Sequence, residues 1–166
     1  MVTVQRKAER GRAPDARLVL AHVERQRARW RATLDTGEVI GVLLPRGTTL
    51  DDGDLLEADD GRVIAVLAAE EDLLEIEEPD AERLARAAWH LGNRHASVEV
   101  LPGRLRTPAD RVIASMLGAA GYAVHSIRAA FRPEPGAYAA GAHAHSSDAR
   151  HAGIIHDFAP RPGEQA

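Results

Sequence analysis

Apolar and polar residues alternate along the first half of the chain. Ala28, Trp30, Ala32 and Leu34 are separated by arginines and a threonine, and this period of two predicts a strand with one buried face. Turns that contain Asp and Gly separate the apolar runs that follow, at residues 39–44, 55–58 and 63–68. The pattern predicts a β-rich domain over residues 16–72, either a self-contained small barrel or a sheet whose edges bind an extended peptide.

The spacing of apolar residues changes in the second half of the chain. After a short strand over residues 73–76, Leu84, Ala87 and Leu91 recur at the spacing of a helix. Asp80 is the expected N-cap of this helix, and the glycine that follows Leu91 is its expected stop.

A strand is expected directly after this helix. Alternation predicts that Ala96, Val98 and Val100 face the core of the domain. His95 and Glu99 then belong to the polar face of the same strand.

The remaining pattern completes a regular order of elements. A short strand at residues 104–106 precedes a second helix, with Thr107 as its predicted N-cap, and a last strand covers residues 122–129. The order over residues 73–138 is βαββαβ, which predicts a ferredoxin-like domain. The fold class is therefore α+β, with a β-rich domain first and the ferredoxin-like domain second.

Both ends of the chain lack periodicity. Residues 1–15 are expected to form a disordered extension, and residues 139–166 are expected to form a flexible tail that contains histidines. Four of the eight histidines of the chain fall in that tail, at positions 143, 145, 151 and 156.

Composition narrows the class of protein. The chain has 166 residues, of which 45% are hydrophobic, and its formal net charge is only −4. The basic residues near the start do not indicate nucleic-acid binding, because the chain as a whole is not basic and holds few aromatic residues for stacking. No apolar run suggests a membrane span or a signal sequence, so we expect a cytoplasmic protein that acts on neither nucleic acid nor membrane.

The absence of cysteine points to histidine as the metal ligand. Imidazole is shared by nickel, zinc and copper sites, and the chain contains no thiolate to compete with it. His143 and His145 can chelate through both rings, although histidines in a flexible tail are also compatible with simple solvation. His95 gains weight if a two-fold axis brings two copies together. His90 is better explained by packing or by the negative end of its helix.

Two further classes of protein stay open on the residues alone. A metal-dependent hydrolase would need rigid ligands and a nearby acid or base, which His90, His95 and Asp110 could supply. A peptide-binding or scaffold protein would use the β-rich domain and would bind no metal tightly.

Several segments together resemble a known family. They are Trp89-His90-Leu91-Gly92-Asn93-Arg94-His95, then Arg31-Ala32-Thr33-Leu34-Asp35 with Leu44-Pro45-Arg46-Gly47-Thr48, and finally Pro133-Glu134-Pro135-Gly136-Ala137-Tyr138 before the histidines of the tail. This combination resembles the UreE family of urease accessory proteins, which are nickel metallochaperones, over about residues 18–145.

The resemblance implies a function and a set of ligands. It implies a homodimer with a peptide-binding-like N-terminal domain and a metal-binding C-terminal domain, and no enzymatic activity. Such a protein passes Ni(II) to apo-urease within an accessory complex that includes a GTPase, and Zn(II) or Cu(II) are possible substitutes in vitro. The interfacial nickel ligand of the family falls on His95, and its tail ligands fall on His143 and His145.

This sequence departs from some relatives in two respects. Where some members carry two further histidines around Asp110, this chain has Ala109 and Arg111, so an accessory metal site there is not expected. The tail has spaced histidines in place of a polyhistidine tract, which argues against bulk nickel storage. The resemblance assigns no role to His151 or His156.

Overall fold

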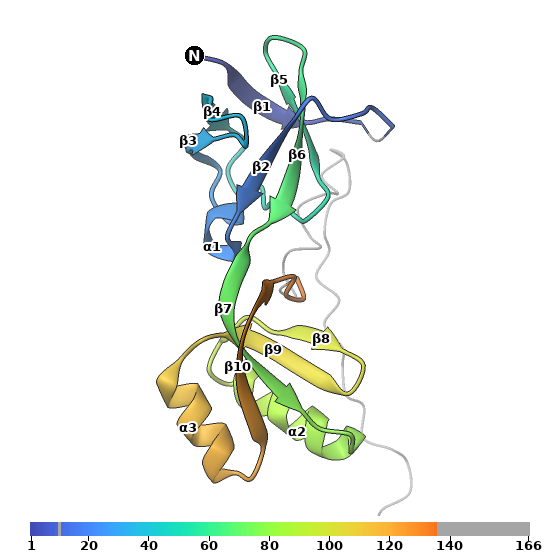
Figure 1. Cartoon of the computed structure of the whole chain (residues 1–166), viewed down its shortest axis with the longest axis vertical. Helices are drawn as coiled ribbons and strands as arrows, with labels where there is room; N and C mark the ends of the chain where they lie inside the picture. The colour runs from blue at the N-terminus through green and yellow to red at the C-terminus, as the bar shows by residue number, and fades with distance from the viewer. Residues whose placement is uncertain (10, 136–166) are drawn as a thin grey trace, which may run out of the picture.

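The computed structural model describes residues 1–9 and 11–135, and these residues form two β-sheets (Figure 1). We call the part built on the first sheet the N-terminal module and the part built on the second sheet the C-terminal module. The modules follow each other along the long axis of the molecule, and strand β7 leads from one to the other (Figure 1). The architecture is α+β, as the sequence predicts.

The N-terminal module contains six strands and one short helix. The strand order in its sheet is β2-β6-β5-β1-β4-β3. The elements are β1 Thr3–Lys7, β2 Ala16–Leu20, α1 His22–Arg25, β3 Arg29–Thr33, β4 Val39–Leu43, β5 Leu55–Ala58 and β6 Val63–Ala68.

The alternating pattern of β3 produces the expected half-buried strand. Ala32 and Leu34 are buried, whereas Arg29 and Arg31 are exposed, so the period of two sorts the two faces. The strand pairs antiparallel with β4 through a turn at Gly37, whose φ of 85° lies in the region that glycine adopts without strain. This hairpin is confirmed in type and in place.

The expectation that residues 1–15 form a disordered extension is wrong. Strand β1 lies between β4 and β5, pairing parallel with the first and antiparallel with the second. Val4 is fully buried in the module. The backbone of β1 is held by two strands distant in the chain, and a pattern within residues 1–15 cannot reveal such partners.

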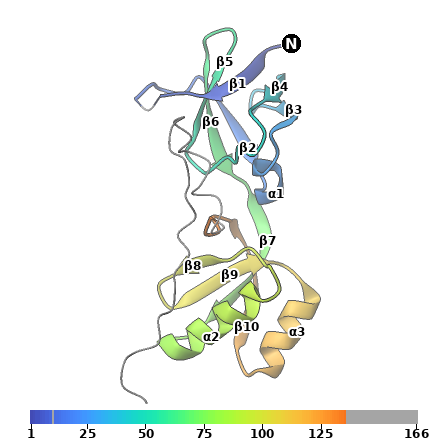
Figure 2. The same ribbon diagram turned by 180° about the vertical axis from the view of Figure 1, so that it is seen from behind.

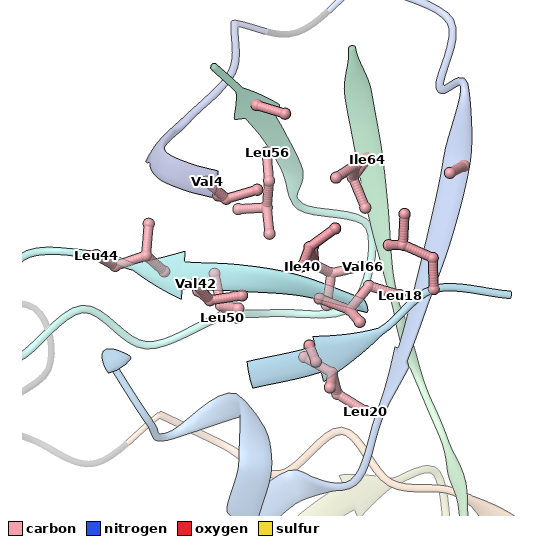
Figure 3. Packing of buried hydrophobic residues seen from close by; sticks show 14 residues of the cluster. Val4, Leu18, Leu20, Ile40, Val42, Leu44, Leu50, Leu56, Ile64 and Val66 are labelled. Carbon is pink, nitrogen blue, oxygen red and sulfur yellow. The ribbon is translucent and has the colours of Figure 1, made fainter. Parts of the chain in front are cut away.

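The core of the N-terminal module lies on the inner face of this sheet. Buried aliphatic side chains from all six strands and from the connecting loops point toward one another (Figure 3). Those labelled in the figure are Val4, Leu18, Leu20, Ile40, Val42, Leu44, Leu50, Leu56, Ile64 and Val66. All of these residues are valine, isoleucine or leucine, and the β-branched ones among them pack well on a pleated surface.

The two edges of the first sheet approach each other at one end. The Asp35 amide donates to the Arg17 carbonyl at 2.9 Å, and the Arg17 amide donates to the Asp35 carboxylate at 3.0 Å. These bonds link the end of β3 to the start of β2. The sheet is therefore partly closed, and part of each edge is not free to accept another strand.

The C-terminal module has the order β7-α2-β8-β9-α3-β10. Its elements are β7 Glu70–Glu77, α2 Ala81–Gly92, β8 Glu99–Leu101, β9 Arg104–Pro108, α3 Arg111–Ala119 and β10 Ala123–Ala130. All strand pairs in it are antiparallel, and the sheet order is β10-β7-β9-β8. This is the ferredoxin-like arrangement that the sequence predicts.

Both helices pack on one face of this second sheet (Figure 2). Leu91 of α2 and Leu117 of α3 are fully buried against Ile76 and Leu105, which lie opposite each other on β7 and β9. Fully burying one such side chain stabilises the fold by roughly 1.5–3 kcal/mol. The other face of the sheet, which carries no helix, is called the open face below.

Helix α3 begins later than the sequence predicts. Thr107 belongs to β9, and the N-cap is Asp110, whose carboxylate accepts from the amides of Val112 and Ile113. Thr107 pairs with Leu74 of β7, and this ladder keeps its backbone extended. The expectation that Thr107 is the N-cap of this helix is therefore wrong.

No helix in the described ranges is long and apolar enough to cross a membrane. The expected flexible tail over residues 139–166 lies outside the described residues, and with it His143, His145, His151 and His156.

Candidate functional site

Helix α2 carries the chain to the first predicted metal ligand. Its N-cap is Asp80, whose carboxylate accepts from the Arg83 amide at 2.9 Å. Ala87 and Leu91 form the buried face, and this fixes the last turn of the helix on the sheet. The predicted start and apolar stripe of α2 are both confirmed.

His95 closes this helix in an uncommon backbone conformation. The Ala96 amide donates to the Leu91 carbonyl at 3.2 Å, and the His95 amide donates to the Gly92 carbonyl at 2.9 Å. This pair of bonds is the Schellman motif, in which one residue adopts the left-handed conformation and is usually glycine. Here that residue is His95, with φ of 55°.

Among the described residues, His95 is the only one other than glycine with a positive φ. Its side chain is exposed to solvent, whereas Ala96, next in the chain, packs against the core. The helix ends at Gly92, within one residue of the predicted end, but the left-handed residue that closes it is His95 and not this glycine. The turn instead places an imidazole at the surface on a fixed backbone.

The strand predicted around His95 is shorter than expected. Strand β8 begins at Glu99, so His95 lies in the turn and not on the polar face of a strand. Val98 packs on the core as predicted, but Glu99 is buried and Val100 is 51% exposed. Val100 lies on an edge strand that the helices do not cover, so it is exposed although it is apolar.

A row of charges explains why Glu99 is buried. The strand register sets Glu99 and Glu75 on either side of Arg106, on the open face. The Arg106 guanidinium lies 2.7 Å from the Glu75 carboxylate and 3.7 Å from that of Glu99. The three side chains come from different strands, so no local sequence motif predicts that they lie together.

The residues of the hydrolase hypothesis are not brought together. His90 lies in the last turn of α2 with its ring against that of Trp89, at 5.0 Å between centroids. The Asp110 carboxylate accepts hydrogen bonds from the first amides of α3. Within residues 1–9 and 11–135, no group of three or more His, Asp or Glu side chains is placed to hold a metal ion. His90, His95 and Asp110 therefore do not form a hydrolytic centre.

Sequence reasoning missed one histidine close to this turn. The Nε2 atom of His22 lies 3.1 Å from the hydroxyl of Ser97, two positions after His95. Burial, assisted by the charge of Arg25, lowers the pKa of His22, and Glu71 opposes this effect only in part. His22 belongs to the N-terminal module, and its short helix has an alanine at the N-cap, so the usual capping signal is absent.

Comparison with known families gives matches over most of the chain. Residues 3–69 match the N-terminal domain, and residues 71–159 the C-terminal domain, of the UreE urease accessory protein family. The first match ends just after β6 and the second begins at the start of β7, where the chain passes from one sheet to the other.

Curated relatives carry the same description. A urease accessory protein UreE of Burkholderia thailandensis is 51% identical over 138 residues, which is 83% of this chain. One of Burkholderia pseudomallei strain 1710b is 52% identical over 132 residues, or 80% of this chain. The alignments cover 63% and 64% of these relatives, so the chain spans slightly less than two thirds of their length.

Proposed function

This chain belongs to the UreE urease accessory protein family, and from that premise we propose that it is a nickel metallochaperone. In the proposal, one Ni(II) ion is bound between two copies of the chain by their two His95 imidazoles. His143 or His145 from a tail completes the coordination. The ion is cargo, which the protein delivers to apo-urease together with an accessory GTPase.

The backbone at His95 is the observation that carries this proposal. A left-handed conformation costs a residue other than glycine roughly 1–2 kcal/mol, and glycine would serve the turn without that cost. An exposed histidine in this position is explained if its imidazole binds a metal ion at the surface. Strain at a single exposed residue is typical of a functional position.

Ligand chemistry supports the use of several histidines. The chain has no cysteine, so imidazole and carboxylate are the strong ligands available to a transition metal. A two-fold axis near His95 would double one exposed imidazole into a pair. Trp89 is 63% exposed at the end of the same helix, and such an exposed aromatic surface is typical of a protein interface.

Release follows from the same chemistry. Only the neutral imidazole binds a metal ion, so protons compete with nickel for each ligand. Nickel affinity should therefore fall as the pH drops from neutral to acid values.

Nickel titration calorimetry on the full chain tests the proposal. We expect His95→Ala to weaken nickel binding by at least tenfold. We expect the His143→Ala/His145→Ala pair to weaken nickel binding as well, either alone or in combination with His95→Ala. The matched control is His90→Gln, which removes a neighbouring imidazole that the proposal does not use. Unchanged affinity in His95→Ala, or the same affinity at pH 5.5 and pH 7.5, would contradict the proposal.

A further inference from the structure

Helix α1 lies at the end of the N-terminal module that faces the C-terminal module (Figure 1). The His22 amide donates to the Glu71 carboxylate at 2.7 Å, and the Nε2 atom of the His22 ring lies 3.1 Å from the Ser97 hydroxyl. The same ring meets Phe131 edge to face, with 5.4 Å between ring centroids. One residue of α1 therefore contacts three segments of the chain that follow the N-terminal module.

The two modules have separate cores. The buried cluster of the N-terminal module and that of the C-terminal module share no residue. Strands β6 and β7 are joined by a single residue, Ala69. Modules of one chain can move relative to each other unless the interface between them is large and hydrophobic. Because neither core depends on the other, the modules can separate without unpacking either one.

The surroundings of His22 suit a neutral imidazole. Its Nε2 atom has the Ser97 hydroxyl as a partner, whereas its Nδ1 atom is buried and has no hydrogen-bond partner among the described residues. In the neutral ring Nδ1 can stay without a proton. In the protonated ring both nitrogens are donors, so a buried N–H would lack an acceptor. An unpaired buried donor costs free energy, and more so when it carries charge.

Two charged groups near the ring act in opposite directions. Arg25 of α1 is only 3% exposed, and its guanidinium donates to the Phe131 carbonyl. Glu71 of β7 attracts a proton to the ring, but its carboxylate already accepts from the His22 amide. Burial, followed by the charge of Arg25, lowers the pKa of His22, and Glu71 opposes this effect only in part.

The other elements around the ring supply charges that have partners of their own. The Arg132 guanidinium, next to Phe131, lies 2.7 Å from the Asp52 carboxylate. The Glu24 carboxylate accepts from a backbone amide at the start of α1. A proton on the ring would therefore add a second positive charge near a buried guanidinium, and the folded arrangement resists it.

We propose that His22 is a pH-sensitive latch between the two modules. The neutral ring holds α1 against Ser97 and Phe131. When the ring takes up a proton from solvent, the latch opens, and the modules turn apart about Ala69 while both cores stay packed. In the open arrangement water hydrates the charged ring and accepts from both of its N–H groups. The latch is a property of the metal-free chain and does not depend on nickel binding.

Distance measurements between two spin labels on the full chain test this latch. The chain has no cysteine, so labels react only at introduced ones, Val39→Cys on β4 and Ser126→Cys on β10, both at exposed positions. The labelled chain is kept free of metal and mixed with excess unlabelled chain, so that distances between copies do not contribute. From pH 7.5 to pH 5.0 the distance distribution should shift and become about twofold broader, as expected for modules that move independently.

Substitutions at His22 separate its charge from other effects of pH. His22→Gln cannot take up a proton, so its distribution should stay narrow at both pH values. His22→Arg carries a permanent charge and should give the broad distribution already at pH 7.5. The matched control is His125→Gln, because His125 is exposed on β10, and this variant should follow wild type. An unchanged distribution in wild type, or broadening in His22→Gln equal to that of wild type, would overturn the latch.

Two further measurements on the wild-type chain distinguish a latch from unfolding. Hydrogen-exchange protection at Val42 and Leu105, one in each core, should persist at pH 5.0. Loss of protection in either core would replace the latch with partial unfolding. The change in distance should also have the same pH midpoint as the titration of the His22 ring followed by NMR. A midpoint that follows another histidine instead would overturn the proposal, even if neither His22 variant folds.

Discussion

At the scale of single residues, His95 combines an exposed ring with a backbone conformation that favours glycine. The Schellman bonds at Leu91 and Gly92 fix that conformation whatever the side chain. Stability and function therefore make opposite demands at this position. Glycine suits the backbone, whereas the proposed function needs the imidazole as a metal ligand.

This conflict leads to a prediction about stability. His95→Gly should raise the free energy of unfolding of the metal-free protein by up to about 1 kcal/mol, because the strain of the left-handed backbone is relieved. His95→Ala should not show this gain, since alanine bears the same strain. Urea denaturation of the three proteins measures the difference. A glycine variant that is clearly less stable than wild type would show that the ring contributes to packing.

The sequence made His95 a candidate ligand, which stays a prediction, but it did not predict the backbone conformation of this residue. Its position after a helix and before Ala96 could be predicted from the sequence. The left-handed backbone could not, because it depends on the bonds that the amides of His95 and Ala96 donate to the carbonyls of Gly92 and Leu91. The burial of Glu99 could not be predicted from the sequence either. Its burial depends on Arg106 across the strand pair, and cross-strand partners are not visible in an alternating pattern.

At the scale of elements, prediction succeeded where the signal is local. The hairpin of β3 and β4 and the span of α2 follow from turns, caps and spacing within a few residues. Strand β1 was missed because its partners β4 and β5 lie far along the chain. Helix α1 could not be predicted because four residues give no periodicity. Its contacts with the C-terminal module are also not visible in the sequence. The domain boundary expected between residues 72 and 73 stays a prediction.

Helix α1 leads to a prediction about pH. Burial and the charge of Arg25 lower the pKa of His22, while Glu71 opposes them, so the folded protein favours the neutral ring. The unfolded chain takes up this proton near pH 6.5, and the folded chain does so only at lower pH. The stabilising effect of neutral His22 is therefore present above pH 6.5 and is lost as the pH falls below it.

Urea denaturation between pH 7.5 and pH 5.5 measures this effect. Wild type should lose more stability over that range than His22→Gln, which has no ionisable ring between the two modules. His125→Gln is the matched control, because His125 is exposed on β10, and it should follow the wild-type profile. Identical profiles for wild type and His22→Gln would show that protonation of His22 does not destabilise the folded protein.

At the scale of the whole molecule, the account depends on two copies of the chain. The α+β fold with two sheets and the ferredoxin-like order could be predicted from the sequence, since both follow from element order. The pairing of copies could not, because an interface depends on surface shape that a pattern of residues does not encode. His143 and His145 lie outside the described residues, so their part in the site stays a proposal.

The central claim is that two chains share one nickel ion through His95. A mixed dimer of one wild-type chain and one His95→Gly chain, purified through two different tags, tests it most directly by nickel titration. The account predicts that the mixed dimer binds nickel almost as weakly as the dimer with both chains changed. A mixed dimer that keeps wild-type affinity at half the stoichiometry would contradict it, because each His95 would then hold an ion alone.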